Sequence, residues 1–240
     1  MTTVAISQPM YFPWAGFLEM MKLADVFIWL DDAQFSKGSF TNRIQVKLPQ
    51  GRKWMTVPLE GKGSFTEIRH LVAKGSDWQA SHRALLAQSL AKRTHLEAAL
   101  AVFDRAMARD TLSDILIASA EEQAQILEAL PARRLLASSL DVSGSSWQRV
   151  IEMVKAVGGT RYISGAGGLG YIDHEAFEAQ GLQIEYMSYN PRPWPQGHGD
   201  FTPYVTGLDL IAGSAEAASH LRPRTDPWQR RMAEREQADE

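Results

Sequence analysis

The 240-residue sequence contains no cysteine, which excludes disulfide bonds, thiolate metal sites and a cysteine nucleophile. It has no strong excess of positive or negative residues, and its formal net charge of −3 disfavours non-specific electrostatic binding to nucleic acid. No apolar run approaches the roughly 20 residues that span a bilayer. The first residues lack the basic and apolar regions of a secretory signal. These absences predict a cytoplasmic protein with no membrane insertion and no nucleic-acid partner.

The apolar content suffices for a full core. Apolar residues make up 45% of the chain, which excludes disorder over most of its length. Residues 4–7 and 25–30 predict short strands, and residues 16–23 between them have helical spacing. This order predicts a parallel βαβ unit with a right-handed crossover. Residues 43–48 and 53–59 flank a Pro-Gln-Gly turn and predict a hairpin with one wet and one buried face.

Helical and mixed segments follow the hairpin. The alanine- and leucine-rich stretch over residues 77–130 predicts three helices that start near Asp77, Thr94 and Thr111 and stop before Pro131. Strands are then predicted over residues 133–138, 161–164 and 182–189, with helices over residues 145–157 and from Asp173. Strands that alternate with helices at both ends predict an α/β fold, with a Rossmann-like parallel or mixed sheet and a helical middle segment.

The chain divides into four parts. Residues 1–75 hold the βαβ unit plus the hairpin, residues 76–132 are the helical segment, and residues 133–222 are a C-terminal α/β part that completes the same domain. Residues 223–240 form a charged tail. We expect this tail to be a solvated helix or a frayed end, and we assign it no function.

Polar side chains gather just after the second predicted strand, where ligands bind in open α/β sheets. The neighbouring carboxylates Asp31 and Asp32, followed by Gln34, can hold Mg²⁺, act as a base or grip an amine. A capping and turn pair is the alternative. Asn42 and Arg43 follow closely, and Arg43 adds a fork of donors suited to carboxylate or phosphate.

A glycine-rich stretch, Gly165-Ala166-Gly167-Gly168-Leu169-Gly170, follows the strand over residues 161–164. A dinucleotide site needs a helix that opens inside this motif and an acidic residue at the end of the next strand. Here Asp173 is the expected N-cap of a later helix, and Glu185 falls inside the next strand. We therefore expect no NAD. A turn that brings backbone amides to a ligand and a purely structural turn both remain open.

Histidines offer a further candidate. His198 and Asp200 lie two apart in a loop and suit an acid/base pair, although a loop histidine is more often simply exposed. The other histidines show no metal-ligand spacing, so no structural zinc is expected.

The stretch over residues 8–17 holds two prolines, a glycine and four aromatic side chains. We expect Phe12 and Phe17 to belong to the core. Gln8, Tyr11 and Trp14 are the candidates for a pocket wall, because the segment follows the first strand and so points at the expected ligand crevice.

Several short blocks are similar to those of one known family. They are Gln8-Pro9 to Phe17, Asp25-Val26-Phe27, Asp32-x-Gln34-Phe35, Asn42-Arg43, Trp54-x-x-Val57-Pro58, Tyr162-x-Ser164-Gly165, Tyr171-Ile172-Asp173, Pro195-Gln196, Phe201-x-Pro203 and Leu208-Asp209-Leu210. In this order, over residues 4–213, they resemble the WbqC-like protein family. The departures are mild: Phe12, Phe17, Phe40 and Gly207 replace an aliphatic residue, a tyrosine, a tryptophan and a serine, respectively.

Members of that family occur in bacterial O-antigen and polysaccharide gene clusters. The resemblance implies transfer of an aminoacyl or acyl group from an activated donor to an amino sugar, with a nucleotide-linked sugar as the expected substrate. A carrier protein or another biosynthetic enzyme is the candidate partner. The residues assigned to catalysis are Asp31, Asp32 and His198, and those assigned to substrate binding are Gln8, Tyr11, Trp14, Gln34, Asn42, Arg43, Ser164, Gly165, Tyr171, Gln196 and Asp209.

A weaker resemblance concerns the first βαβ unit. Nucleotidylyltransferases carry H-x-G-H on the turn after their first strand, and this chain has Trp14-Ala15-Gly16-Phe17 there. Ile163-Ser164-Gly165 falls where such enzymes carry a late phosphate loop. Because both histidine positions hold aromatic residues, phosphate-polarising chemistry of that type is not expected.

Three hypotheses remain from the sequence. The first is the transferase, in which Asp32 holds or deprotonates the amine and Arg43 binds phosphate or carboxylate. The second is a non-catalytic module that binds a nucleotide sugar or a partner enzyme. The third is a metal-dependent hydrolase that uses the aspartates.

Overall fold

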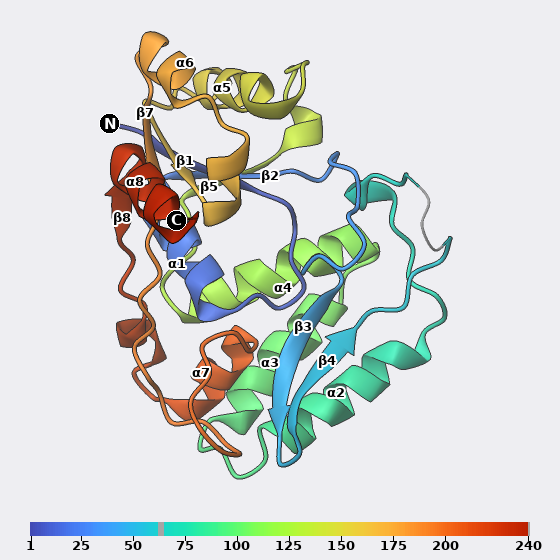
Figure 1. The fold of residues 1–240 in the computed structure, drawn as a ribbon. Coiled ribbons are helices and arrows are strands. Elements are labelled where there is room, and N and C mark those ends of the chain that lie inside the picture. The colour runs from blue at the N-terminus through green and yellow to red at the C-terminus, as the bar shows by residue number, and fades with distance from the viewer. Residues whose placement is uncertain (62–64, 240) are drawn as a thin grey trace.

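The protein is described here by a computed structural model that covers residues 1–61 and 65–239. Its centre is a six-stranded sheet in the order β5-β2-β1-β6-β7-β8 (Figure 1). The strands are β1 (Thr3–Ser7), β2 (Val26–Trp29), β5 (Arg133–Leu136), β6 (Arg161–Ser164), β7 (Gln183–Met187) and β8 (Thr225–Pro227). The first five are parallel and β8 is antiparallel to β7. The α/β prediction with a Rossmann-like sheet is confirmed.

Helices cover both faces of the sheet because its central strands are apolar on both sides. Val4 and Ile6 of β1 pack into one core, whereas Ala5 packs into the other. Helices α1 (Ala15–Leu23) and α4 (Leu112–Ile126) belong to the core of Ala5, and α5 (Ser146–Ala156) and α6 (His174–Ala179) belong to the core of Val4 and Ile6. The sheet is thus the middle layer of three.

The segment between β2 and β5 is a large insertion. It contains the hairpin strands β3 (Arg43–Leu48) and β4 (Gly51–Thr56), followed by α2 (Asp77–Ser89), α3 (Leu96–Met107) and α4. The hairpin and the three helices are those predicted from the sequence, although β4 begins two residues earlier. Leu48 pairs with Gly51, so the turn consists of Pro49 and Gln50, and Gly51 adopts a φ of +113° that favours glycine.

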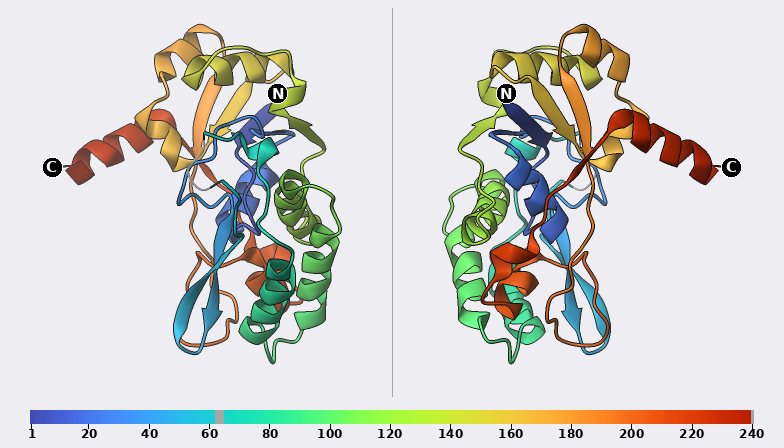
Figure 2. Two further views of the ribbon diagram at one scale, coloured as in Figure 1. Left: turned by 90° about the vertical axis from the view of Figure 1, so that its right-hand side faces the viewer. Right: turned by 90° about the vertical axis from the view of Figure 1, so that its left-hand side faces the viewer.

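Several predicted bounds differ from the structure, and the strand predicted over residues 133–138 ends at Leu136. The strand predicted over residues 182–189 ends at Met187, and the tail contributes the edge strand β8 before helix α8 (Trp228–Asp239). Trp228 fixes the start of α8, because its ring stacks on His174 at 4.6 Å and its Nε1 donates to Glu178 Oε1 at 2.8 Å. Beyond that contact, Arg235 Nη1 donates to Leu169 O at 3.1 Å, and α8 projects outward from the sheet (Figure 2).

Short elements complete the described chain. They are the 3-10 helices η1 (Ile68–His70), η2 (Ala137–Ser139), η3 (Ala166–Gly170) and η4 (Ala217–His220), and helix α7 (Gly207–Gly213), which packs against α3. Within residues 1–61 and 65–239, no helix combines the length and apolar character that a bilayer span requires.

Candidate functional site at the carboxyl edge of the sheet

The strand order defines where a ligand crevice is expected. From β1 the chain adds β2 and then β5 on one side of the sheet. It then returns to the other side of β1 and adds β6 and β7 there, so the direction of strand addition reverses between β1 and β6. In such sheets ligands bind outside the carboxyl ends of the strands at this point. Gln8 follows β1, Ser164 is the last residue of β6, and Gly165 follows it. Three predicted site residues therefore lie at the topological switch point.

The side-chain amide of Gln8 is the first polar side chain after β1. The residue is half-buried, and its main-chain oxygen accepts a hydrogen bond from Ser7 Oγ at 3.2 Å. Among the described residues, its side-chain amide makes no hydrogen bond. A half-buried amide with unused donors and an acceptor is available to a polar ligand.

The glycine loop after β6 is a tight turn with an open outer surface. A Cβ on Gly168 would overlap Ser164 Oγ and lie 2.8 Å from Ile172 Cδ1, whereas Cβ atoms on Gly165 and Gly167 would meet nothing within 4 Å. Gly168 is therefore required by packing, and the other two leave backbone exposed. Both interpretations of the loop, ligand approach and structural turn, agree with this geometry.

The surroundings of the loop differ from a dinucleotide site. The helix after it, α6, begins only beyond Asp173, whose carboxylate caps it by accepting from Ala176 N at 3.0 Å. Glu185 lies inside β7 and pairs with Arg161 at 3.4 Å. Tyr171 follows the loop with half of its side chain exposed, and burial of the other half raises the pKa of its phenol.

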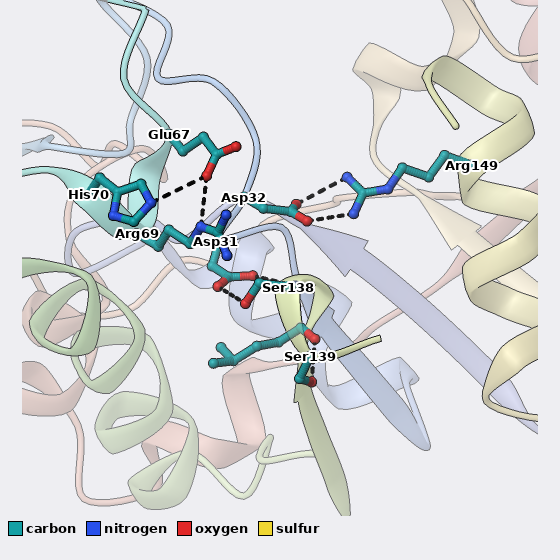
Figure 3. Close-up of polar contacts among 9 residues, drawn as sticks. Asp31, Asp32, Glu67, Arg69, His70, Ser138, Ser139 and Arg149 are labelled. Atoms are coloured by element: carbon teal, nitrogen blue, oxygen red, sulfur yellow. Dashed lines mark hydrogen bonds and ion pairs between the residues drawn. The ribbon is translucent and has the colours of Figure 1, made fainter. Parts of the chain in front are cut away.

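Asp31, which follows β2, is a structural residue. Its side chain is 2% exposed, and both carboxylate oxygens are used by Ser138: Oδ1 accepts from the backbone N at 3.0 Å and Oδ2 accepts from Oγ at 2.5 Å (Figure 3). Ser138 lies in η2, directly after β5. Asp31 thus fixes the end of β2 to the end of β5, and its burial keeps the carboxylate from a substrate.

The side chain of Asp32 points away from that of Asp31 and forms a bidentate ion pair with Arg149 (Figure 3). Nη1 of Arg149 lies 3.1 Å from Oδ1, and Nη2 lies 2.5 Å from Oδ2. The side chains are 13% and 20% exposed, so both partners border solvent. The hydrogen bond from Arg149 to Asp32 is the main cause that raises the pKa of the guanidinium.

Sequence reasoning missed Arg149 because 117 positions separate it from Asp32. One signal was present. Arg149 lies in the first turn of α5, where the helix dipole disfavours a cation. A cation at such a position indicates a nearby anion.

A short two-stranded contact borders this pair. Gln34 forms a β-bridge with Glu67, and Arg69 N donates to the main-chain oxygen of Asp31 at 2.7 Å. Glu67 in turn contacts Arg69 Nε at 2.7 Å and His70 Nε2 at 3.6 Å (Figure 3). The predicted binding residue Gln34 is exposed here.

Asn42 and Arg43 are not brought to Asp31 and Asp32 by any hydrogen bond or ion pair among the described residues. Asn42 is buried, and its Nδ2 donates to Val57 O at 2.9 Å, so it holds the hairpin in place. Arg43 stacks its guanidinium over the Trp54 ring at 4.2 Å and donates from Nη2 to Gly38 O.

The predicted residues near the C-terminus form a second cluster, around Lys47 of β3. Lys47 Nζ donates to Gln196 Oε1 and Gly199 O, both at 3.1 Å, and to the main-chain oxygen of Asp200. Asp209 lies in the same cluster: it is buried, accepts from Trp194 Nε1 at 2.7 Å, and burial raises the pKa of its carboxyl. The loop over residues 194–202 is thus bound to the hairpin by polar contacts.

His198 and Asp200 do not form the predicted acid/base pair. No side-chain contact joins them among residues 1–61 and 65–239, and Asp200 contributes only its main-chain oxygen to the bonds of Lys47. His198 adopts a φ of +61°, and its Nε2 is buried without a hydrogen-bond partner.

The aromatic stretch after β1 is mainly core. Phe12 and Phe17 are buried, which confirms that expectation. Tyr11 is also fully buried, and its hydroxyl bonds His82 Nδ1 at 2.8 Å, so it forms no pocket wall. Trp14 is half-buried against Phe40, with ring centroids 4.9 Å apart.

In the turn that resembles a nucleotidylyltransferase loop, side chains of the protein occupy the space beside Gly16. A Cβ on Gly16 would lie 2.8 Å from both Trp14 Nε1 and Tyr189 Cγ. The close approach that this glycine permits is therefore made by two aromatic side chains.

No three or more His, Asp or Glu side chains lie close enough to hold a metal ion in the part of the chain that the structure describes. The carboxylates of Asp31 and Asp32 are already engaged by Ser138 and Arg149. The hydrolase hypothesis therefore has no donor set within this part.

Comparisons with known proteins agree with the blocks recognised in the sequence. The chain matches the sequence model described as the WbqC-like protein family over residues 8–220. It is also 31% identical over 239 residues to a protein of Mycobacterium tuberculosis (strain ATCC 25618 / H37Rv) named Uncharacterized protein Rv1507c, and this match covers 92% of the chain and 98% of the relative. No solved structure gives a significant match.

Proposed function

Since the chain belongs to the WbqC-like protein family, we propose that it is a transferase that attaches an aminoacyl or acyl group to a nucleotide-linked amino sugar. The observation that carries this proposal is the ion pair of Asp32 and Arg149 at the carboxyl edge of the sheet. A carboxylate and a guanidinium held side by side are complementary to a molecule that bears an ammonium group and a phosphate. A nucleotide-linked amino sugar bears both.

Binding of the amino sugar then replaces the ion pair of Asp32 and Arg149 by ion pairs with the substrate. The sugar ammonium replaces Arg149 on Asp32, and the released guanidinium binds a phosphate oxygen, for which its planar fork is suited. Both side chains border solvent, so this exchange needs no opening of the core. Asp31 remains bonded to Ser138 and keeps the adjoining backbone fixed.

Before the transfer step the bound ammonium gives one proton to Asp32, which passes it to solvent, and the free amine remains. The amine nitrogen forms a bond to the carbonyl carbon of the activated donor, and the bond from that carbon to the leaving group breaks. The leaving group takes the electron pair, and the second proton that the nitrogen loses goes to Asp32 and then to solvent. General-base assistance of this kind contributes about 10²–10⁴-fold to a rate.

The switch point supplies the remaining contacts for the sugar nucleotide. The free amide of Gln8 and the open backbone at Gly165 suit hydroxyl groups, and the half-exposed ring of Tyr171 suits the apolar face of a sugar or base. Partnership with a carrier protein or another biosynthetic enzyme stays a prediction from the family resemblance.

The experiment is direct detection of the amide product. Purified protein is incubated with UDP- or dTDP-linked amino sugars and with thioester or ATP-activated donors, and products are identified by mass spectrometry. Asp32→Asn keeps the shape of the side chain and is expected to lower the rate at least about 100-fold. Asp104→Asn is the matched control, because Asp104 makes a similar two-point pair with Arg83 on exposed helices. Equal rates for D32N and the wild type would contradict the role of Asp32.

One observation favours a second candidate, a non-catalytic module that binds the sugar nucleotide. Both carboxylates at the site are already hydrogen-bonded, and Ser164 Oγ, a hydroxyl beside the crevice, bonds to the carbonyl of Gly165 at 3.1 Å. A thermal shift of several degrees with one nucleotide sugar and no turnover with any donor would support this candidate over the transferase.

A further inference from the structure

A cavity of about 350 Å³ lies beside the hairpin, apart from the switch point. Its walls are mainly apolar and come from Phe35, Val57, Leu59 and Leu71. Lys37 and Arg43 bring two cations to the lining, and Glu60 brings one carboxylate. We propose that this cavity, here called the hairpin cavity, binds the apolar part of a short carboxylic acid or of its activated acyl derivative, with the carboxyl oxygen held by Arg43 and Lys37.

Arg43 and Lys37 both have N–H donors that no described residue accepts from. The Arg43 guanidinium uses Nη2 for Gly38 O and stacks on Trp54, but its buried Nε has no acceptor among the described residues. Lys37 makes no hydrogen bond or ion pair within residues 1–61 and 65–239, and its side chain is exposed at the rim. A ligand oxygen therefore adds an acceptor where the protein offers several unused donors.

Size and lining together indicate the kind of ligand that this cavity takes. A volume of about 350 Å³ lies at the lower end of the roughly 300–1,000 Å³ that small-molecule pockets span. That volume suits a short acyl chain or a single ring. Its mainly apolar walls favour an acyl chain over a nucleotide joined to a sugar, so we assign the hairpin cavity to the other substrate.

The hairpin cavity is close to the ion pair along the chain. Phe35 in its wall is three residues beyond Asp32, a span of at most about 11 Å for extended chain. This segment is held in place, because Phe35 N donates to Thr66 O at 2.9 Å and Ile68 N donates to Ala33 O at 3.0 Å. The hairpin cavity therefore adjoins the segment that carries Asp32, and its assignment as the acyl site rests on the proposed function.

Binding is tested with the full chain and without any sugar nucleotide. Calorimetry measures the affinity for hexanoate, for hexanamide, which lacks the charge, and for acetate, which lacks the alkyl chain. The three values show how much the chain and the charge each contribute to binding. We expect hexanoate to bind at least tenfold more tightly than either of the other two. Equal affinity for all three would overturn the proposal.

Two variants locate the bound acid. Thr56 is exposed at the end of β4 and lines the hairpin cavity, so Thr56→Trp fills it at little cost to the hairpin. We expect T56W to weaken hexanoate binding at least tenfold. Arg43→Met should weaken hexanoate but not hexanamide, and Arg52→Met, at the far end of the same hairpin, should change neither. Unchanged hexanoate binding in both T56W and R43M, with melting temperatures near that of the wild type, would overturn the site.

The two proposals fail separately. If the acid binds as described and no amide product forms with any sugar nucleotide, the hairpin cavity stands and the transferase does not. If amide forms in T56W as fast as in the wild type, the transferase stands and the assignment of the hairpin cavity does not.

Discussion

Asp31 accepts two hydrogen bonds from Ser138, one from the backbone and one from the hydroxyl, across 107 positions of the sequence. The contact joins the ends of β2 and β5 directly behind the ion pair of Asp32. Removing the hydroxyl leaves a buried carboxylate oxygen without a partner, which costs about 1–3 kcal/mol.

We therefore expect Ser138→Ala to lower the free energy of unfolding by about 1–3 kcal/mol in urea denaturation. Ser139→Ala is the matched control, since the exposed Ser139 bonds only the main-chain oxygen of Leu136. That variant should change stability by no more than about 0.5 kcal/mol. Similar losses in the two variants would contradict a special role for Ser138.

Acid should destabilise the protein in part through His82. Burial lowers the pKa of His82 from 6.5 to about 4. Between these pH values the imidazole is protonated in the unfolded chain and neutral in the folded chain. The stability from this residue is full above about pH 6.5 and is lost as the pH falls toward 4. The loss is about 2–3 kcal/mol.

The measurement is the free energy of unfolding from pH 7 to 4 in the wild type and in His82→Gln, which keeps a polar partner for Tyr11. The variant should be less stable at pH 7 and should lose less stability over this range. Parallel curves for the two proteins would show that His82 is not the titrating group.

Gly168 and Gly167 offer a direct comparison inside the glycine loop. Gly168→Ala forces a methyl group against Ser164 and Ile172, and we expect a loss of about 1–3 kcal/mol in thermal or urea unfolding. Gly167→Ala points into open space and should stay within about 0.5 kcal/mol of the wild type. The reverse order of stabilities would mean that the loop packs differently.

The attachment of α8 depends on Trp228. Trp228→Ala removes the stacking on His174 and the bond to Glu178, so the arginines of α8 should be cut by trypsin several times faster. Trp228→Phe keeps an aromatic ring at this position and should be cut at an intermediate rate. Identical cleavage of all three proteins would show that Trp228 does not anchor the helix.

The sheet and its helices could be predicted because their apolar spacing is strong. Residues such as Val26, Ile28 and Val150 repeat at the periods of strand and helix. Strand β8 could not be predicted, since Thr225, Asp226 and Pro227 carry no apolar pattern. A proline is tolerated there because β8 is an edge strand.

The sequence indicates the polar residues at the strand ends better than it indicates their partners. The carboxylates after β2 and the polar residues after β1 and β6 were identified because strand ends are visible in the sequence. Their partners were not: Arg149 and Ser138 reach Asp32 and Asp31 from distant segments. The alternation of the hairpin likewise placed Lys47 on a wet face, yet the loop over residues 194–202 covers it to 5% exposure.

The packing of α7 has a consequence for how the chain folds. His95 N donates to Ala212 O at 3.2 Å, and Gly207 N donates to Pro13 O at 2.9 Å, so α7 joins the middle of the chain to its first loop. Contacts between such distant segments slow folding, because a long loop must close before they form. During synthesis the helical layer stays open on one side until residue 213 is available. A fragment that ends at α6 would expose part of the apolar surface of α3 and should aggregate.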